Sequence, residues 1–264
     1  MVRSLSLLTA AVAACLFFSA AVSAEIVTRD VEYTDGDMTF QGYLAYDDAN
    51  TGAVPGVAIV HQWKGLGDSE KRRARMLAEL GYVAFAVDVY GKGVRPATSQ
   101  EASAEAGKYY QDRNLLRQRV TLGVEQLKEF DGVDTERIAA IGYCFGGGGV
   151  LELARSGYDV DGVVSFHGTL KTPTPGDAQN ITASVLVCHG ADDPHAPMED
   201  VIALNEEMDA AEVDYYIMLF GNAVHSFTHP EAGDDPSNGS AYNAEADWRS
   251  WEAMKDFFTQ IFKK

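Results

Sequence analysis

Cysteine and basic residues are scarce in this sequence. Three cysteines occur in 264 residues, and one of them, Cys15, falls in an apolar N-terminal segment. Because only Cys144 and Cys188 remain for the folded part, the chain is not a disulfide scaffold. Lysine and arginine total 21 against 39 acidic residues, a net charge of −18. Such acidity argues against nucleic acid and anionic membrane surfaces as partners.

Repeats, low-complexity tracts and flexible linkers are also lacking, and this favours a single domain. Residues 1–24 differ in character, because they carry one charge and a long apolar stretch that ends in Ala21-Val22-Ser23-Ala24. The pattern is typical of a secretory signal peptide cleaved before Glu25. It predicts an exported domain over 25–264, periplasmic or secreted. The stretch is short for a membrane anchor, and lipoprotein cleavage at Cys15 is an alternative.

Apolar runs of strand length alternate with helical patterns along the rest of the chain. The first two runs, 26–33 and 38–46, alternate apolar and polar residues and indicate an antiparallel hairpin. Later runs are uninterrupted, as in strands covered on both faces. The sequence therefore predicts an α/β fold with a mostly parallel sheet, helices on both faces and an antiparallel N-terminal hairpin. Further strands are expected at 57–60, 82–87, 137–141, 160–166, 184–188 and 215–219. Helices are expected from a cap at Asp68 or Ser69 to Gly81, and over 100–130, 150–155, 199–210 and 244–262.

The segment Gly142-Tyr143-Cys144-Phe145-Gly146 joins a predicted strand to a predicted helix. A glycine two residues on either side of a nucleophile lets the chain turn sharply, because a Cβ atom at either site would clash. The turn lifts Cys144 to the N-terminus of the helix, where free N–H groups and the helix dipole favour a thiolate or an oxyanion. A close-packed turn with Cys144 as a small buried residue is the alternative on this motif alone.

Two further loops follow the ends of predicted strands. Open parallel sheets place their sites beyond the carboxyl ends of the strands, so these loops are expected to meet Cys144. One contains Asp193 and the other His225. A nucleophile, an acid and a histidine in this chain order match the triad order of α/β-hydrolases. His225 would deprotonate Cys144 while Asp193 holds the imidazole, with Asp192 as the alternative acid.

Taken together, these motifs resemble the dienelactone hydrolases of the α/β-hydrolase superfamily. The resemblance implies an α/β-hydrolase fold and a Cys144–His225–Asp193 triad that hydrolyses small esters and lactones through an acyl-thioester, without metal or cofactor. It also implies an oxyanion hole made by the backbone N–H groups of Phe145 and Trp63. The likeness extends from about Val57 to the C-terminus. It is carried by Gly142-Tyr143-Cys144-Phe145-Gly146-Gly147, Gly190-x-x-Asp193-Pro194, Ala223-Val224-His225-Ser226-Phe227, and Leu80-Gly81-Tyr82 with Asp88-Val89-Tyr90.

The sequence departs from this family at the expected substrate contacts. Gln62 stands where founding members carry a glutamate that switches the resting thiol, and an amide cannot take up a proton as a carboxylate does. The two arginines that bind the dienelactone carboxylate fall at Lys92 and His229, with Arg95 near the first. Loss of that fork weakens bidentate carboxylate recognition. The sequence therefore favours a different small ester, lactone or thioester over dienelactone.

The remaining cysteine and histidines have simpler interpretations. Cys188 lies in an apolar run and is interpreted as an inert core thiol, with a disulfide to Cys144 as the alternative. The other histidines near strand ends lack zinc-ligand spacing and are interpreted as hydrogen-bonded loop or core residues. These are His61, His167, His189 and His195.

Two rival functions stay open at the level of the sequence. The same thiol could act as a thioesterase or acyltransferase. A fold alone does not fix function, so a non-catalytic binding or thiol-sensing protein on a hydrolase scaffold is the second rival. The partner expected of a hydrolase is a small-molecule ester or lactone, and the sequence does not indicate an oligomeric state.

Overall fold

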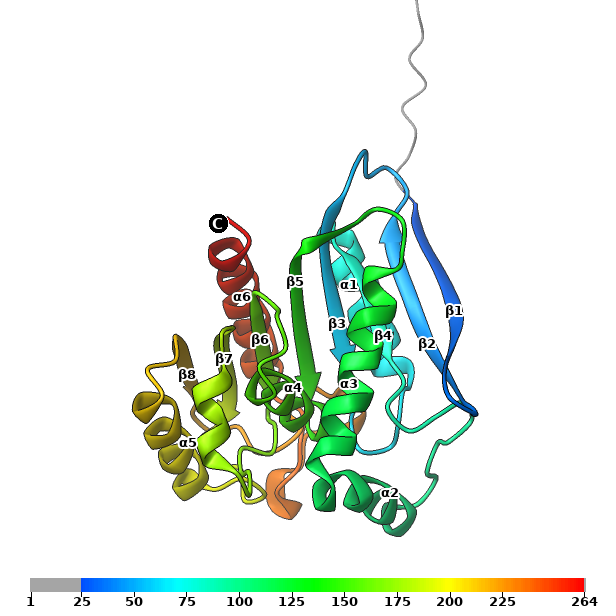
Figure 1. Cartoon of the computed structure of the whole chain (residues 1–264). Coiled ribbons are helices and arrows are strands. Elements are labelled where there is room, and N and C mark those ends of the chain that lie inside the picture. The colour runs from blue at the N-terminus through cyan, green and yellow to red at the C-terminus, as the bar shows by residue number, and fades with distance from the viewer. Residues whose placement is uncertain (1–24, 264) are drawn as a thin grey trace, which may run out of the picture.

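The uninterrupted apolar runs form the centre of one eight-stranded sheet (Figure 1). The computed structural model describes residues 25–263, so the predicted signal peptide lies outside the described residues. The sheet order is β1-β2-β4-β3-β5-β6-β7-β8. Its strands are β1 (Ile26–Asp35), β2 (Met38–Asp47), β3 (Val54–Val60), β4 (Val83–Val87), β5 (Val133–Tyr143), β6 (Gly162–Phe166), β7 (Ser184–Gly190) and β8 (Tyr215–Phe220).

Strand direction confirms the predicted fold class. The strands from β3 to β8 pair in parallel. The hairpin of β1 and β2 is antiparallel, and β2 joins β4 in antiparallel register. Because parallel neighbours need crossover connections, α-helices separate most of these strands in the sequence and cover the sheet. A short 3-10 helix, η1 (Pro175–Asn180), lies between β6 and β7. The architecture is that of an α/β-hydrolase.

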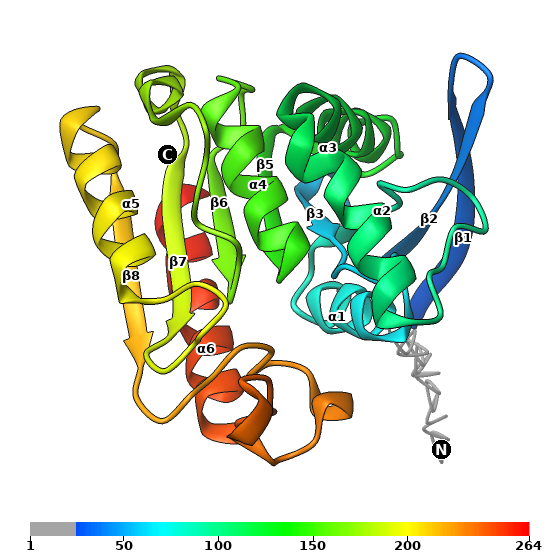
Figure 2. The same cartoon turned by 90° about the horizontal axis from the view of Figure 1, so that it is seen from below.

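Helices pack on both faces of the sheet (Figures 1 and 2). One buried apolar cluster lies under α2, α3, α4 and α5, and a second lies under α1 and α6. The apolar stripe of the last helix is buried as predicted, with Met254 and Phe258 fully enclosed. The helices are α1 (Asp68–Glu79), α2 (Ser99–Gln111), α3 (Arg113–Lys128), α4 (Phe145–Arg155), α5 (Met198–Ala210) and α6 (Ala244–Ile261).

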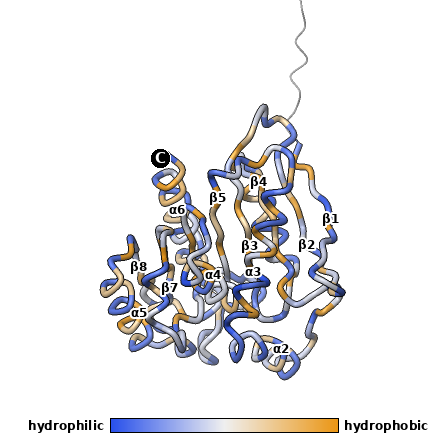
Figure 3. Tube along the Cα trace, viewed as in Figure 1, coloured by the Kyte–Doolittle hydropathy of each residue, from blue (hydrophilic) through white to orange (hydrophobic). Residues whose placement is uncertain are grey.

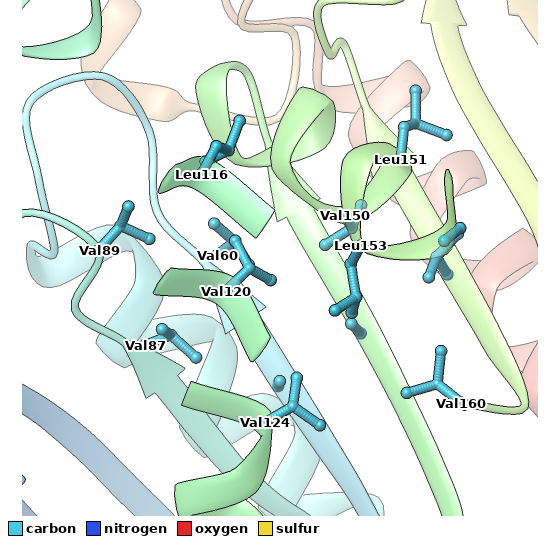
Figure 4. Packing of buried hydrophobic residues seen from close by; sticks show 14 of the residues in the cluster. Val60, Val87, Val89, Leu116, Val120, Val124, Val150, Leu151, Leu153 and Val160 are labelled. Atoms are coloured by element: carbon cyan, nitrogen blue, oxygen red, sulfur yellow. The ribbon is translucent and has the colours of Figure 1, made fainter. Parts of the chain in front are cut away.

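Aliphatic side chains fill the space between the central strands and α3 and α4 (Figure 4). The central strand β3 is among the hydrophobic parts of the trace in Figure 3. Val60 of β3 and Val87 of β4 face Val120 and Val124 of α3, and all four are fully buried. Gly123 makes this approach possible, because a Cβ atom there would lie 2.2 Å from Val87 Cγ1. Close packing of this kind fixes the strand ends that carry the site.

Three predicted helix boundaries were wrong. The helix expected over 150–155 begins at Phe145. The helix expected over 100–130 is divided at Asp112, whose extended backbone ends α2 and whose carboxylate accepts the Leu115 N–H to begin α3. The N-cap of α1 is Gly67 rather than Asp68 or Ser69. Gly67 has no side chain that could cap the helix. Instead, the Glu70 carboxylate inside the helix accepts the Gly67 N–H at 2.9 Å.

The carboxyl ends of the parallel strands lie together at one edge of the sheet. In Figure 1 the arrowheads of β3 and β5 point to the lower edge, and Figure 2 looks at this edge from below. Every loop with a predicted catalytic residue starts from such an end. Within residues 25–263, no helix has both the length and the apolar character needed to cross a membrane.

Candidate active site

Cys144 occupies the sharp turn between β5 and α4. Its backbone is in an unusual region for a residue with a side chain, with φ of 54° and ψ of −113°. The flanking glycines make the turn possible. A Cβ atom at Gly142 would lie 2.0 Å from the Gly146 carbonyl oxygen, and one at Gly146 would lie 2.1 Å from the Val60 carbonyl oxygen. Only glycine fits at both positions, as the sequence predicted.

The structure brings the three predicted triad side chains into one hydrogen-bonded chain. His225 Nε2 lies 3.1 Å from Cys144 Sγ, and His225 Nδ1 lies 2.8 Å from Asp193 Oδ2. The second carboxylate oxygen of Asp193 accepts backbone N–H groups of His195 and Ala196 at 2.8 and 3.3 Å. Asp193 is 3% exposed, and it rather than the exposed Asp192 contacts the imidazole.

Backbone contacts fix the acid loop and the histidine loop relative to each other. The Asp192 N–H donates to the Ala223 carbonyl oxygen at 3.0 Å, and a Cβ atom at Gly190 would lie 2.5 Å from that same oxygen. On its other side, His225 donates its N–H to Gly239 and accepts from Ala241 N–H. The distance from Asp193 to His225 is thus set by the main chain.

The electrostatics of the site favour a protonated imidazole. Burial alone lowers the pKa of His225, but the adjacent charges of Cys144 and Asp193 outweigh it and raise the pKa to about 10. The pKa of Asp193 is lowered by its hydrogen bond to His225 in spite of burial. An imidazole that lies between a carboxylate and a thiol is placed to hold or transfer a proton at the sulfur atom.

The two predicted oxyanion-hole residues follow the ends of two neighbouring strands, β5 and β3. Phe145 is the first residue of α4, and Trp63 lies in the loop after β3, packed against the same core cluster as Cys144. Tyr90 donates its hydroxyl to the Trp63 carbonyl oxygen at 3.0 Å. The donor role of the two N–H groups stays a prediction.

The four predicted substrate contacts separate into two pairs. Gln62 Nε2 lies 3.2 Å from His229 Nδ1, and both residues line a cleft of about 460 Å³ that also borders Trp63 and Ser226. Lys92 and Arg95 are outside the lining of this cleft. Lys92 pairs with Glu32 at 2.7 Å and Arg95 with Asp88 at 3.3 Å, so each cation already has an acidic partner.

Two tyrosines that interact electrostatically with Cys144 were not predicted as site residues from the sequence. Burial, and after it the charge of neighbouring groups that include Cys144, raises the pKa of Tyr110 to about 12 and raises that of Tyr90 further. Both phenols are therefore neutral, and the Tyr110 hydroxyl shares a hydrogen bond of 3.1 Å with the Thr169 hydroxyl. Tyr90 belongs to the motif Asp88-Val89-Tyr90 that follows β4, which is a usable signal. Tyr110 sits in a helix whose register alone does not indicate the site.

Cys188 is a buried free thiol, and Cys144 is also free, so the predicted alternative of a disulfide between them was wrong. Burial raises the pKa of the Cys188 thiol far above its usual range, as expected of an inert core residue.

A larger cleft of about 830 Å³ lies between β8 and α6, where Tyr216 and Trp248 line it. None of Cys144, Asp193 and His225 lines either cleft. The smaller cleft is lined by Trp63 and by Ser226, which directly follows His225, so it is the better candidate for substrate.

Comparison with known proteins places these features in context. The model of the dienelactone hydrolase family matches residues 40–262. A Yersinia pestis protein that carries the provisional name carboxymethylenebutenolidase is 30% identical over 83% of this chain and 82% of its own. The solved structure called m3DLH is 38% identical, with a TM-score of 0.86, over 89% of this chain and 98% of its own. A dienelactone hydrolase-like promiscuous phosphotriesterase from metagenomic libraries is 41% identical, with a TM-score of 0.84 and the same coverage.

Proposed function

This chain belongs to the dienelactone hydrolase family and is a lactone or ester hydrolase, and on that premise we propose that it works through a Cys144–His225–Asp193 triad. The observation that carries the proposal is the chain of contacts from Cys144 Sγ to His225 at 3.1 Å and from His225 to Asp193 at 2.8 Å. A nucleophile, a base and an orienting acid in this arrangement are the parts needed for covalent acyl transfer.

The proposed reaction has two halves. The Cys144 thiolate attacks the carbonyl carbon, and the oxyanion that forms is stabilised by the N–H groups of Phe145 and Trp63. The carbonyl re-forms as the bond to the alkoxide breaks, and His225 gives its proton to that oxygen. The neutral imidazole then takes a proton from water, and hydroxide attacks the acyl-thioester. The acid leaves, and Cys144 returns to its resting state with His225 protonated.

The proposed substrate is a small ester or lactone that carries no free carboxylate and so does not need an arginine side chain to bind it. Lys92 and Arg95 are paired with acidic side chains away from the cleft, and His229 is held by Gln62. A planar guanidinium fork is the group best suited to a free carboxylate. Uncharged aryl and alkyl esters and simple lactones therefore fit the cleft better than dienelactone.

The test is hydrolysis of p-nitrophenyl butyrate and of a panel of lactones by the wild type and three variants. We expect Cys144→Ala and His225→Ala each to lower kcat/KM by about 10³-fold or more, because loss of one triad member leaves only the remaining site to act. Cys188→Ala is the matched control, since it removes the other thiol and is expected to keep wild-type turnover. Wild-type turnover by Cys144→Ala would refute the proposal.

The two rival functions give different results in the same assay. An acyltransferase would form ester or amide when an alcohol or amine is added, whereas a hydrolase would still release mainly acid. A non-catalytic binding or thiol-sensing protein would hydrolyse none of the panel. Its Cys144 would react with iodoacetamide no faster than free cysteine does.

A second candidate activity is hydrolysis of phosphate triesters. It is favoured by 41% identity over 89% of this chain to a promiscuous phosphotriesterase. A thiolate that attacks carbon can also attack phosphorus, while the same N–H groups face the phosphoryl oxygen. The aryloxide would leave with the proton of His225, and water would then cleave the P–S bond to release the diester and the thiolate. Release of p-nitrophenol from paraoxon by the wild type, lost in Cys144→Ala, would support it. Release that Cys144→Ala leaves unchanged would refute a role for the triad.

Residues 1–24 are proposed to direct export, with cleavage before Glu25. The support is the composition of this segment, with a single charge before an apolar stretch and Ala-x-x-Ala at its end. The mass and N-terminal sequence of the protein recovered from the periplasm or medium of an expressing cell would test this. Retention of Met1 or lipid on Cys15 would contradict it.

A further inference from the structure

His61 is a fully buried histidine that the proposed reaction does not use. It directly follows β3 and has no solvent exposure. Its ring lies edge-on to Tyr90, with centroids 4.6 Å apart, and stacks on Phe145 at 5.8 Å with an interplanar angle of 17°. A polar ring held this tightly in an apolar core requires hydrogen bonds on its nitrogens.

The hydrogen bonds of His61 define one tautomer. The Val89 N–H donates to His61 Nε2 at 3.2 Å, so this nitrogen must be an acceptor. Burial lowers the pKa of His61 to about 4, and the ring is therefore neutral in neutral solution. A neutral imidazole with an acceptor at Nε2 carries its hydrogen on Nδ1.

The donor on Nδ1 holds the peptide group that contains the Trp63 N–H. His61 Nδ1 lies 2.6 Å from the Gln62 carbonyl oxygen, which also accepts the Gly65 N–H at 3.1 Å. The Gln62–Trp63 peptide is trans, so its carbonyl and its N–H point in opposite directions. Fixing the carbonyl of Gln62 thus fixes the direction of the Trp63 N–H.

Further contacts brace the same loop and link it to the elbow. The Glu70 carboxylate accepts the N–H groups of Gln62 and Gly67 at 3.3 and 2.9 Å. Gly146 lies against the loop, since a Cβ atom there would be 2.7 Å from the His61 carbonyl oxygen. His61 therefore contacts the residues that carry both predicted oxyanion donors. It hydrogen-bonds the peptide group that contains the Trp63 N–H, and its ring stacks on the ring of Phe145.

We infer that His61 is a positioning residue whose Nδ1–H holds the Gln62–Trp63 peptide with its N–H directed at the oxyanion. The inference rests on the proposed function, because it assumes that the reaction passes through an oxyanion bound at Trp63. His61 does not touch substrate in this scheme. It acts through the peptide it holds.

The test compares His61→Leu with His61→Asn in the full chain. Leucine fills the space without a donor, whereas the asparagine amide can place an N–H near the position of Nδ1. Loss of one oxyanion donor costs about 10²–10³-fold in kcat. Since a misdirected donor is a partial loss, we expect His61→Leu to lower kcat by about 10- to 100-fold with little change in KM. His61→Asn is expected to recover most of this loss.

Two readouts separate positioning from general damage. A trifluoromethyl ketone forms an oxyanion on the thiol, so its affinity for His61→Leu should fall by the same factor as kcat/KM. Alkylation of Cys144 by iodoacetamide needs no oxyanion hole and should stay near the wild-type rate. Wild-type kcat in His61→Leu, or an equal fall in alkylation and turnover, would overturn the inference.

The tautomer of His61 can be determined in the wild-type protein, so this test does not require any variant to fold. Long-range ¹H–¹⁵N spectra of histidine-labelled protein should show His61 protonated at Nδ1 alone, and a ring protonated at Nε2 would overturn the inference. Cys144→Ala tells the two proposals apart. If it keeps wild-type turnover, the proposed function fails. If it is inactive while His61→Leu is fully active, only the role of His61 fails.

Discussion

Asp193 illustrates how firmly single side chains are held in this site. Three hydrogen bonds engage its two oxygens, two from backbone N–H groups and one from His225. The carboxylate can therefore neither rotate away nor exchange its partner without loss of a bond in a buried place. It fixes the imidazole in the orientation in which Nδ1 faces Asp193 and Nε2 faces Cys144.

We predict that Asp193→Asn lowers kcat by about 10³–10⁴-fold, because an amide that turns its NH2 group to His225 selects the wrong tautomer. Steady-state hydrolysis of p-nitrophenyl butyrate measures the effect. Asp192→Asn is the matched control on the adjacent exposed residue and should keep wild-type turnover. Equal losses in the two variants would show that the loop, and not the carboxylate of Asp193, is what matters.

The raised pKa of His225 also predicts how stability depends on pH. Its pKa in the folded protein is about 10 against an ordinary 6.5, so folding favours the protonated ring. This contribution is complete below about pH 6.5 and is lost as the pH rises through about 10. Urea unfolding of the wild type and His225→Gln should show a difference in unfolding free energy that is largest near pH 6 and shrinks toward pH 10. A difference that grows with pH would contradict the assignment.

At this scale the sequence predicted which three side chains meet at the elbow but not what surrounds them. Cys144, Asp193 and His225 sit in motifs with fixed local spacing, and the order of those motifs indicates the fold that joins them. The contacts of Tyr90 with Trp63 and of His61 with Val89 join residues about thirty apart. No local sequence pattern encodes such a pair, so these contacts follow only from the three-dimensional fold.

At the scale of elements, strands were easier to predict than helix ends. Buried parallel strands give uninterrupted apolar runs, and all eight strands of the sheet were located. The break at Asp112 was missed because an aspartate inside a helical pattern can face solvent or cap a new helix, and only the backbone decides. Glu70 was missed as the group that caps α1 because it reaches back three residues to a glycine.

The elbow makes a prediction about the join of β5 and α4. Gly146→Ala would place a methyl group 2.1 Å from the Val60 carbonyl oxygen, which is backbone and cannot move aside easily. We expect a loss of about 3 kcal/mol or more in unfolding free energy, at the upper end for overpacking. Chemical denaturation measures it.

Gly107→Ala is the matched control for this substitution. Gly107 lies inside α2, and nothing lies within 4 Å of the position that a methyl group would take there. Alanine should therefore stabilise the helix by about 0.5–1 kcal/mol. If both variants were equally destabilised, glycine would be needed for a reason other than close contact at the elbow.

At the scale of the whole molecule, the excess of acidic residues is the dominant feature. The chain carries 39 acidic against 21 basic residues. Many acids have partners, among them Glu152 and Glu207 around the buried Arg155. Far more acids than bases remain, and their mutual repulsion opposes the compact state.

Salt should therefore stabilise this protein. Raising the ionic strength from about 10 mM to about 0.5 M shortens the Debye length from about 30 Å to a few ångströms and screens this long-range repulsion, while buried pairs such as Arg155–Glu207 are screened much less. We expect Tm to rise by a few degrees over this range in scanning calorimetry. Sucrose at matched osmolality is the control for effects unrelated to charge. A fall in Tm with salt would mean that surface ion pairs outweigh the repulsion.

The positive φ of Cys144 has a consequence for how the molecule is used over its lifetime. A backbone in such a region costs on the order of 1–3 kcal/mol, and the surrounding packing must supply it. This free energy is subtracted from the stability of the fold when the chain folds, and it does not recur with each turnover. The sulfur atom is therefore already positioned before any substrate binds, and the protein has a lower thermal stability than it would have without this strained turn.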